Sequence, residues 1–336
     1  MPGGDNPTRI DWYRTPVDGK TLAALNRRSD WQGFLQTAGT LGLLALSATV
    51  AWMAFDNLPV IAFLLLVYLH GTFWAFLLNA FHEFCHKTVF KAKWLNTLFL
   101  YVISFLSWNN PVFFWASHQE HHKYTLFPPS DLEVILPVKL TLKQFLQNAF
   151  VNPWEFYTRL KSTIRLSLGR LEGEWENYLF PPEAVKQRQR LFNWARIQLI
   201  GQALIVAIPL YFGLWLVPLL ITLAPFYGSG LQFLCNNTQH VGLQDKVSDF
   251  RLCTRTILLN PFVRFLYWHM NYHIEHHMYA AVPCYNLGKL HKAIEADLPP
   301  SPRGLAAAWK EIIPILNKQK LDPSYQFVAR LPEKKI

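Results

Sequence analysis

The chain of 336 residues carries charged side chains at only 16% of its positions, against about 25% in average soluble proteins, and 51% of its residues are hydrophobic. This composition argues against an ordinary soluble enzyme and favours a membrane protein. The net charge of +10 is compatible with nucleic-acid binding, but basic cytosolic loops of a membrane protein give the same total. Since the sequence has no zinc finger and no basic aromatic RNA-binding motif, no nucleic-acid partner is expected.

The first thirty residues are polar and rich in proline and glycine. They lack the apolar region of a secretory signal, so residues 1–30 are predicted to form a cytosolic N-terminal segment. A transmembrane helix needs about 20 apolar residues. The uncharged stretches 31–55 and 57–81 meet this requirement, and we expect them to be the first two spans, joined by a tight turn at FDNLP.

A third uncharged stretch, 95–117, is interrupted by three asparagines and a proline. If it crossed the membrane, His82 and His118 would lie on opposite faces of the bilayer. We therefore interpret its apolar piece, 94–108, as an interfacial or re-entrant helix.

Residues 197–244 contain no Asp, Glu, Lys or Arg and are long enough for two further spans of about 20 residues each. These spans are predicted at about 197–217 and 218–240. Neither predicted hairpin turn carries Lys or Arg, whereas residues 1–30 carry five and residues 118–192 carry ten. The positive-inside rule then places both termini and the central region in the cytosol.

Nine of the twelve histidines form four clusters, and most of them are three or four residues apart. Residues at that spacing share one face of a helix with Cβ atoms about 5–6 Å apart, so two neutral imidazoles can reach one metal ion. With four crossings, every cluster faces the cytosol and all nine can meet at the membrane surface. The clusters are His82 and His86; His118, His121 and His122; His240; and His273, His276 and His277.

Nine imidazoles exceed the four ligands that close a zinc site and suit two metal ions with four or five nitrogens each. Imidazole suits iron, zinc and copper, so the ligand type leaves the metal open, although the absence of cysteine from the clusters argues against an iron–sulfur cluster. Asn236 is a candidate to complete a shell through water. Nearby carboxylates are candidates to accept the outer N–H of a ligand: Glu83, Glu120, Glu275, Asp131 and Asp249.

The remaining histidines are predicted to stay outside the ligand set. His70 lies in the middle of a span and is expected to be a core residue. His269 is expected at the surface or behind a ligand, and His291 lies on a polar amphipathic helix without a cluster. The four cysteines are far apart and do not suggest a disulfide framework.

The motifs HEFCH, HQEHH and HIEHH, in this order, resemble the three histidine boxes of the membrane fatty acid desaturase and hydroxylase superfamily. NNTQHVGL resembles the additional histidine box of that family, and YHIEHHMYAAVPCYNLGKLH resembles its third box with the following turn and helix. The resemblance covers roughly residues 30–295. The short first box, HxxxH, is more similar to acyl-lipid than to acyl-CoA desaturases.

The resemblance implies a diiron centre that uses O2 as co-substrate, and it carries a ligand role onto the nine clustered histidines. The implied activity is desaturation of an unactivated fatty acyl (acyl-lipid) chain. The alternative is a diiron membrane hydroxylase or oxidase of an alkyl chain or a smaller metabolite. Metal transport, a third reading, requires polar side chains along the spans, which are almost absent.

Electrons for O2 activation are expected from a separate protein, because the sequence lacks GxGxxG, CxxC and HPGG motifs. We expect a ferredoxin, rubredoxin or cytochrome b5 type donor with its reductase. The basic run VKQRQR at 185–190 is a candidate docking site for an acidic carrier, although ordinary positive-inside charge is the favoured explanation.

The complete prediction is an all-α integral membrane protein with four transmembrane helices and a cytosolic helical cap that carries a histidine-rich dimetal site. The membrane and cap domain is placed at 31–295, followed by a cytosolic C-terminal tail at 296–336. The expected location is a bacterial inner membrane or the endoplasmic reticulum, with the active site on the cytosolic face.

Overall fold

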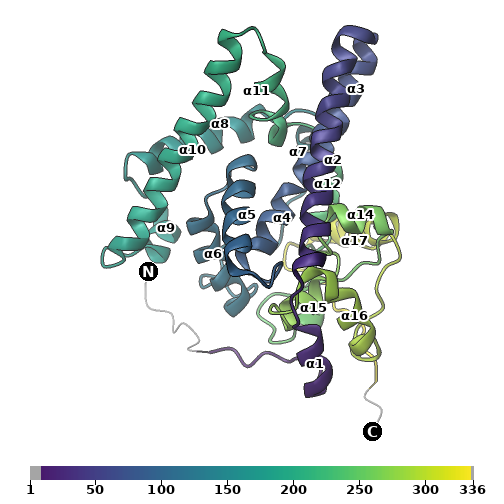
Figure 1. Ribbon diagram of the computed structural model, residues 1–336. Coiled ribbons are helices and arrows are strands. Elements are labelled where there is room, and N and C mark those ends of the chain that lie inside the picture. The colour runs from purple at the N-terminus through teal and green to yellow at the C-terminus, as the bar shows by residue number, and fades with distance from the viewer. Residues whose placement is uncertain (1–8, 334–336) are drawn as a thin grey trace. The chain divides into compact units, whose positions relative to one another are not determined.

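The computed structural model describes residues 9–333, and every named element in that range is a helix (Figure 1). The ends of the predicted cytosolic segments 1–30 and 296–336, namely residues 1–8 and 334–336, lie outside the described residues. The all-helical class is therefore confirmed for the part of the chain that is described.

The chain divides into two compact units. We call residues 30–116 and 141–233 the membrane unit, and residues 9–29, 117–140 and 234–333 the histidine unit.

The membrane unit contains the long apolar helices and several short connecting ones. Its elements are α2 (Asp30–Asn57), α3 (Val60–Ala75), α4 (Leu77–Cys85), α5 (Lys93–Leu106), the first part of α6 (Pro111–Tyr124), α7 (Leu142–Ala149), α8 (Pro153–Ser167), α9 (Gly173–Leu179), α10 (Val185–Tyr211), α11 (Leu216–Leu220), η1 (Ala224–Phe226) and the start of α12 (Gly230–Asn236).

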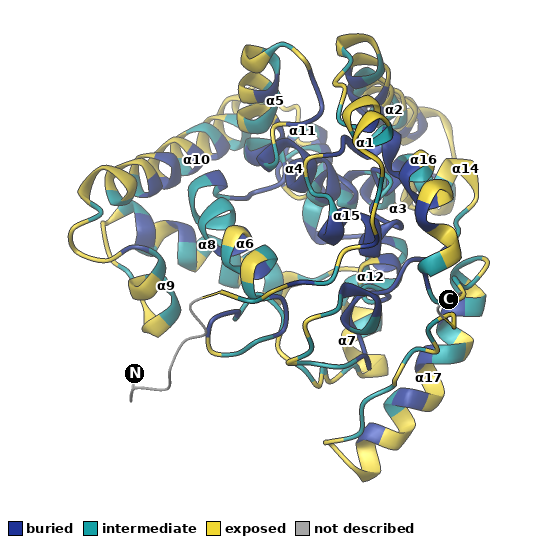
Figure 2. Ribbon diagram, turned by 90° about the horizontal axis from the view of Figure 1, so that it is seen from below, coloured by how far each residue is buried: buried dark blue, intermediate teal, exposed yellow. Residues whose placement is uncertain are grey.

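Three helical stretches are long and apolar enough to cross a membrane: α2, the run Val60–Cys85 formed by α3 and α4, and α10. The predicted spans 31–55 and 57–81 are confirmed as apolar helices. The predicted third span, 197–217, corresponds to α10, which begins earlier and ends earlier. Figure 2 shows exposed residues along α10 and α2, as expected for helices whose outer surfaces face lipid.

The prediction of a continuous fourth span at 218–240 is wrong. This segment contains only the short helices α11, η1 and α12, separated by turns. Two prolines and three glycines between residues 213 and 230 interrupt it. Gly228 has a φ of +71°, and a Cβ there would lie 2.7 Å from the carbonyl oxygen of Tyr68 in α3, so this turn requires glycine.

Helices α5 and α6 form a pair bent by 104° at a short break. The break follows from local chemistry, because α6 begins at Pro111 and the side-chain oxygen of Asn110 accepts hydrogen bonds from the N–H groups of Val112 and Phe113. The two helices are either one broken span or a re-entrant pair. The predicted interruption is thus confirmed, and the membrane unit has three or four candidate spans within the described residues.

The histidine unit is built from shorter helices: α1 (Gly19–Leu25), the end of α6, the end of α12, α13 (Phe250–Cys253), α14 (Pro261–Leu266), α15 (His273–Met278), α16 (Cys284–Ile294), η2 (Glu295–Asp297) and α17 (Leu305–Leu321). Helix α15 packs against α13 and α16, and all six of its residues are buried. A helix this short is not stable alone, so its position depends on these neighbours.

Candidate metal centre

Seven of the nine clustered histidines lie in the histidine unit, and six of them lie on two helices. Helix α6 carries the first HxxHH box and α15 carries the second, while His240 lies in the turn that follows α12. Six of these seven imidazoles are buried, and His122 is half-buried. Their Nε2 atoms converge in two groups.

The first group, which we call set A, consists of His118, His122 and His276. The Nε2 atom of His122 lies 3.0 Å from that of His118 and 3.2 Å from that of His276. One nitrogen from each of the three rings lies within 4.8 Å of the others, close enough for one metal ion.

The second group, set B, consists of His121, His240, His273 and His277. Nitrogens of His121, His240 and His277 lie within 4.8 Å of one another. The Nε2 atom of His273 joins them, at 2.9 Å from Nε2 of His240 and 3.1 Å from Nε2 of His277.

Each HxxHH box supplies both sets. In α6 the pair four residues apart, His118 and His122, belongs to set A, and His121 points to set B. In α15 the arrangement is reversed, because His273 and His277 belong to set B and His276 to set A. Two short helices therefore present two neighbouring metal-binding groups, as helical spacing allows.

Hydrogen bonds on the outer nitrogens orient the rings. The Nδ1 atom of His121 lies 2.8 Å from the Asp131 carboxylate, and Nδ1 of His118 lies 2.9 Å from that of Glu133. His240 donates its Nδ1–H to the carbonyl oxygen of Cys253 at 2.9 Å. Since a carbonyl only accepts, Nε2 of a neutral His240 must carry the lone pair that faces set B.

Burial disfavours the charged form of two set B imidazoles, whereas the Asp131 carboxylate raises the pKa of His121 despite its burial. Burial lowers the pKa of His240 to about 3, assisted by the neighbouring His121, and it also lowers the pKa of His277. Burial opposes ionisation of Asp131 as well, but the adjacent His121 and two backbone N–H groups outweigh it and lower the pKa of Asp131. Burial raises the pKa of Glu133 to about 7.

The donor set fits metal ions. Within each set, Nε2 atoms of neighbouring rings approach one another to between 2.9 and 3.2 Å. Two nitrogens that bind one metal at about 2.1 Å and at right angles are separated by roughly 3 Å, which matches this spacing. The buried, cysteine-free histidine sets can therefore hold two borderline-soft metal ions.

The first box lies in the membrane unit. His82 and His86 have ring centroids 4.9 Å apart at the end of α4, with His82 buried and His86 half-buried. The buried carboxylate of Glu83 lies 3.4 Å from Nδ1 of His82. This pair has the geometry of two ligands to one ion.

Several residues predicted to support the ligands are engaged elsewhere. Asn236 is exposed, which argues against a role in the buried shell. Glu120 pairs with Lys123 at 2.6 Å on the surface of α6. Asp249 caps α13 and binds the Arg251 guanidinium. Of the five predicted carboxylates, Asp131 meets the expectation in the histidine unit, and Glu83 lies beside His82 in the membrane unit.

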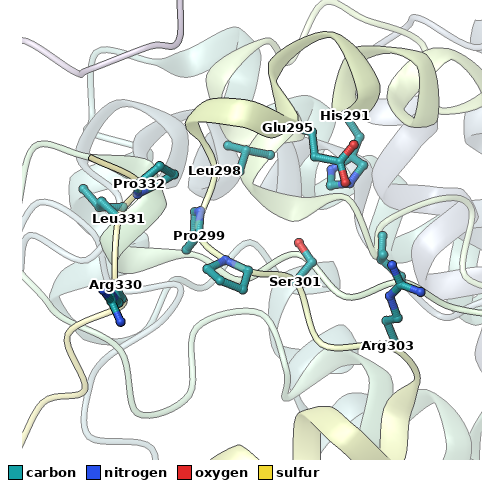
Figure 3. Close-up of a pocket in the computed structure, with 11 residues that line it drawn as sticks. His291, Glu295, Leu298, Pro299, Ser301, Arg303, Arg330, Leu331 and Pro332 are labelled. Atoms are coloured by element: carbon teal, nitrogen blue, oxygen red, sulfur yellow. The ribbon is translucent and has the colours of Figure 1, made fainter. Parts of the chain in front are cut away.

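Glu275 also has a different role from the predicted one. Its two carboxylate oxygens bind the hydroxyl of Thr256 and Nδ1 of His291, all buried. His291 belongs to neither histidine set, and its buried partner is this carboxylate. His291 also lines a separate cavity of about 490 Å³, where it lies beside Glu295 and across from Arg330 (Figure 3).

Three supporting groups were missed from the sequence. Glu133 stands two residues after Asp131 in SDLEV, and that spacing is the only local signal for it. The Cys253 carbonyl gives no sequence signal at all. The Arg255 guanidinium donates to the carbonyl oxygens of Thr238 and Val241, on either side of His240, and pairs with Glu311.

His70 behaves as the predicted core residue. It is fully buried in α3, with its ring nitrogens bonded to the Ser47 hydroxyl and the Leu220 carbonyl. His269 is half-buried at a positive φ of 59° in the turn before α15, where its carbonyl oxygen accepts the N–H of Tyr272.

Comparison with known proteins agrees with this arrangement. The family model described as Fatty acid desaturase matches residues 57–309, more than half of the chain, and this range includes all nine clustered histidines. A search of curated proteins found no match.

Proposed function

The chain belongs to the fatty acid desaturase family, and on this premise we propose that it is an O2-dependent diiron desaturase of acyl lipids. Membership implies an oxidoreductase that acts on a lipid or acyl substrate in a membrane. The carrier of the acyl chain and the iron content belong to the proposal. The observation that carries it is the convergence of buried imidazole nitrogens into sets A and B.

We assign the ligands as nine histidines divided between two ions. Set B provides four nitrogens for one ion. Set A provides three for the other. We also propose His82 and His86 of the membrane unit as ligands, which gives nine imidazoles for two ions, as the sequence predicts. The support is the 4.9 Å spacing of the His82 and His86 rings and their place at the end of a candidate span.

When bound, the irons supply the oxidation of an unactivated C–H bond by O2. Overall, two hydrogens leave neighbouring carbons, O2 becomes two waters, and an external donor supplies two electrons and solvent two protons. Burial favours the neutral form of His240 and His277, and Asp131, Glu133 and the Cys253 carbonyl hold Nδ1 of their histidines so that Nε2 faces the proposed metal positions. Burial of α15 keeps bulk water away from set B.

The donor is proposed to be a ferredoxin, rubredoxin or cytochrome b5 type protein with its reductase. The site is placed on the cytosolic face of a bacterial inner membrane or the endoplasmic reticulum, on the basis of the charge asymmetry between loops. The donor class and the cytosolic location are both proposed from the sequence. Activity of the protein in vesicles, with each donor added on one side of the membrane, tests them.

The deciding experiment combines metal analysis with product analysis. The purified protein is expected to contain two irons per chain and, with a reductase system, O2 and a glycerolipid, to give an alkene that has lost two hydrogens. An alcohol that has gained one oxygen would support the hydroxylase instead. A fully active protein without iron would overturn the proposal.

A further inference from the structure

Helices α7 and α8 carry an exposed apolar stripe in a region that the sequence placed in the cytosol. The stripe consists of exposed side chains on both helices and their junction: Leu142, Leu146, Phe150, Val151, Trp154, Tyr157, Ile164 and Leu168. Trp154 is 68% exposed, Tyr157 52% and Leu168 63%. Large exposed patches of this kind mark interaction surfaces rather than ordinary scattered apolar residues.

On α8 the exposed apolar residues share one face. At 100° per residue, Trp154, Tyr157, Ile164 and Leu168 fall within an arc of roughly 80°. Lys161 lies in the same arc and is exposed. Its long side chain can place the ammonium group in water while its methylene groups cover apolar surface.

The opposite face of α8 is already used inside the membrane unit. The ring of Phe156 packs edge-on against Trp108 and Phe226, and Leu166 lies in a buried cluster with Leu191 of α10. Arg159 on this side donates to the side chain of Asn109. The exposed stripe is therefore a second apolar face of α8, which does not pack against the rest of the membrane unit.

The stripe continues into the surface of a candidate span. The ring of Phe150 lies 6.2 Å from that of Tyr68 in α3, and α3 also exposes Ile61, Leu64 and Leu65. These residues belong to an apolar helix long enough to cross the bilayer. The stripe thus adjoins this candidate span at the contact between Phe150 and Tyr68.

We propose that the α7–α8 stripe lies in the membrane interface, with its apolar side chains at the boundary between headgroups and acyl chains. Tryptophan and tyrosine are the residues enriched at this depth, and the Trp154 and Tyr157 rings pair at 5.4 Å on the stripe. The exposed Lys143 and Lys161 flank the apolar residues and suit lipid phosphates. The partner is the bilayer of this protein's own membrane, and the inference depends on membrane association of the family rather than on metal chemistry.

The proposal corrects the assignment of residues 118–192 to the cytosol for the part that contains α7 and α8. An interfacial position also leaves the sidedness of the neighbouring loops unchanged, because such a helix does not cross the bilayer.

The test uses a fluorophore attached to single introduced cysteines. The four native cysteines are buried, so they need not be removed. Labels are placed in the full chain at Tyr157→Cys and Leu168→Cys on the stripe, and at Glu174→Cys, an exposed polar position on α9, as a matched control. The protein is reconstituted in vesicles of phosphatidylcholine and phosphatidylglycerol.

Labels at 157 and 168 are expected to be quenched several-fold more by nitroxide-labelled lipid than by aqueous iodide, with the opposite ratio at 174. Iodide quenching at 157 and 168 equal to that at 174 would overturn the proposal. Protection that appears in detergent and grows with protein concentration would also overturn it, because it would identify a second copy as the occupant.

Discussion

At the scale of single residues, the hydrogen bond that an imidazole makes through Nδ1 decides whether its Nε2 can offer a lone pair to a metal ion. Asp131 accepts from His121, and the Cys253 carbonyl accepts from His240. These bonds leave Nε2 with a lone pair toward the centre of set B and restrict rotation of the ring. The orientation of these candidate ligands therefore depends on neighbouring residues outside the two sets.

Asp131→Asn is expected to weaken metal binding by about 10- to 100-fold, because His121 loses the charged acceptor that fixes its ring. The measurement is the chelator concentration that removes half of the iron. Glu120→Gln is the control, since Glu120 pairs with the exposed Lys123 and should leave that concentration unchanged. Equal values for wild type and Asp131→Asn would contradict the orienting role.

Arg255 holds the turn that carries His240, a candidate ligand outside α6 and α15. It binds the backbone on both sides of His240, so Arg255→Met is expected to release His240 and cost about half of the bound iron, with set A retained. Arg251→Met is the matched control, because Arg251 is equally buried and ion-paired with Asp249 and Asp297. Iron should return in part with Arg255→Lys. Equal iron loss in both methionine variants would indicate general destabilisation.

At the scale of elements, breaks in helices matter as much as the helices. Proline and glycine end the apolar pattern after α10, so the following segment forms short helices instead of a span. Asn110 and Pro111 start α6 in a new direction, which gives the 104° bend from α5. That bend allows a re-entrant path in place of a crossing.

The re-entrant path predicts that both ends of the α5–α6 pair face the cytosol. Cysteines introduced at the exposed positions Lys93 and Gln119 should react with a membrane-impermeant maleimide from the same side of oriented vesicles. A cysteine at the exposed Asn57, in the turn between the first two spans, serves as the control and should react from the opposite side. Labelling of positions 93 and 119 from opposite sides would establish a crossing.

At the scale of the molecule, the seven imidazoles of the histidine unit come from three separate stretches of chain: α6, the turn at His240, and α15. Their Nε2 atoms meet at close to 3 Å, and a cation bound there would link all three stretches. Metal binding and folding of this unit are therefore coupled.

Removal of metal is accordingly expected to lower the thermal unfolding temperature. A ligand at 100 times its Kd adds about 2.7 kcal/mol to the free energy of unfolding, and chelation removes that contribution. Unfolding curves with and without a chelator, followed by readdition of Fe²⁺, measure the effect. His277→Ala should show a smaller difference than wild type, whereas an identical unfolding temperature with and without metal in the wild type would contradict the coupling.

The helical class, the first two apolar helices, the break near residue 110 and the clustering of nine histidines are all predictable from the sequence, because composition and helical spacing are local properties. How the seven histidines of one unit divide between sets A and B, and which groups orient them, is visible in the folded chain alone. Those outcomes depend on contacts between segments far apart in the sequence, such as Arg255 with Glu311 and His122 with His276. Local periodicity carries no information about such partners. For the same reason it predicted a span at 218–240, where the chain instead forms short helices and turns, some of which pack against α3.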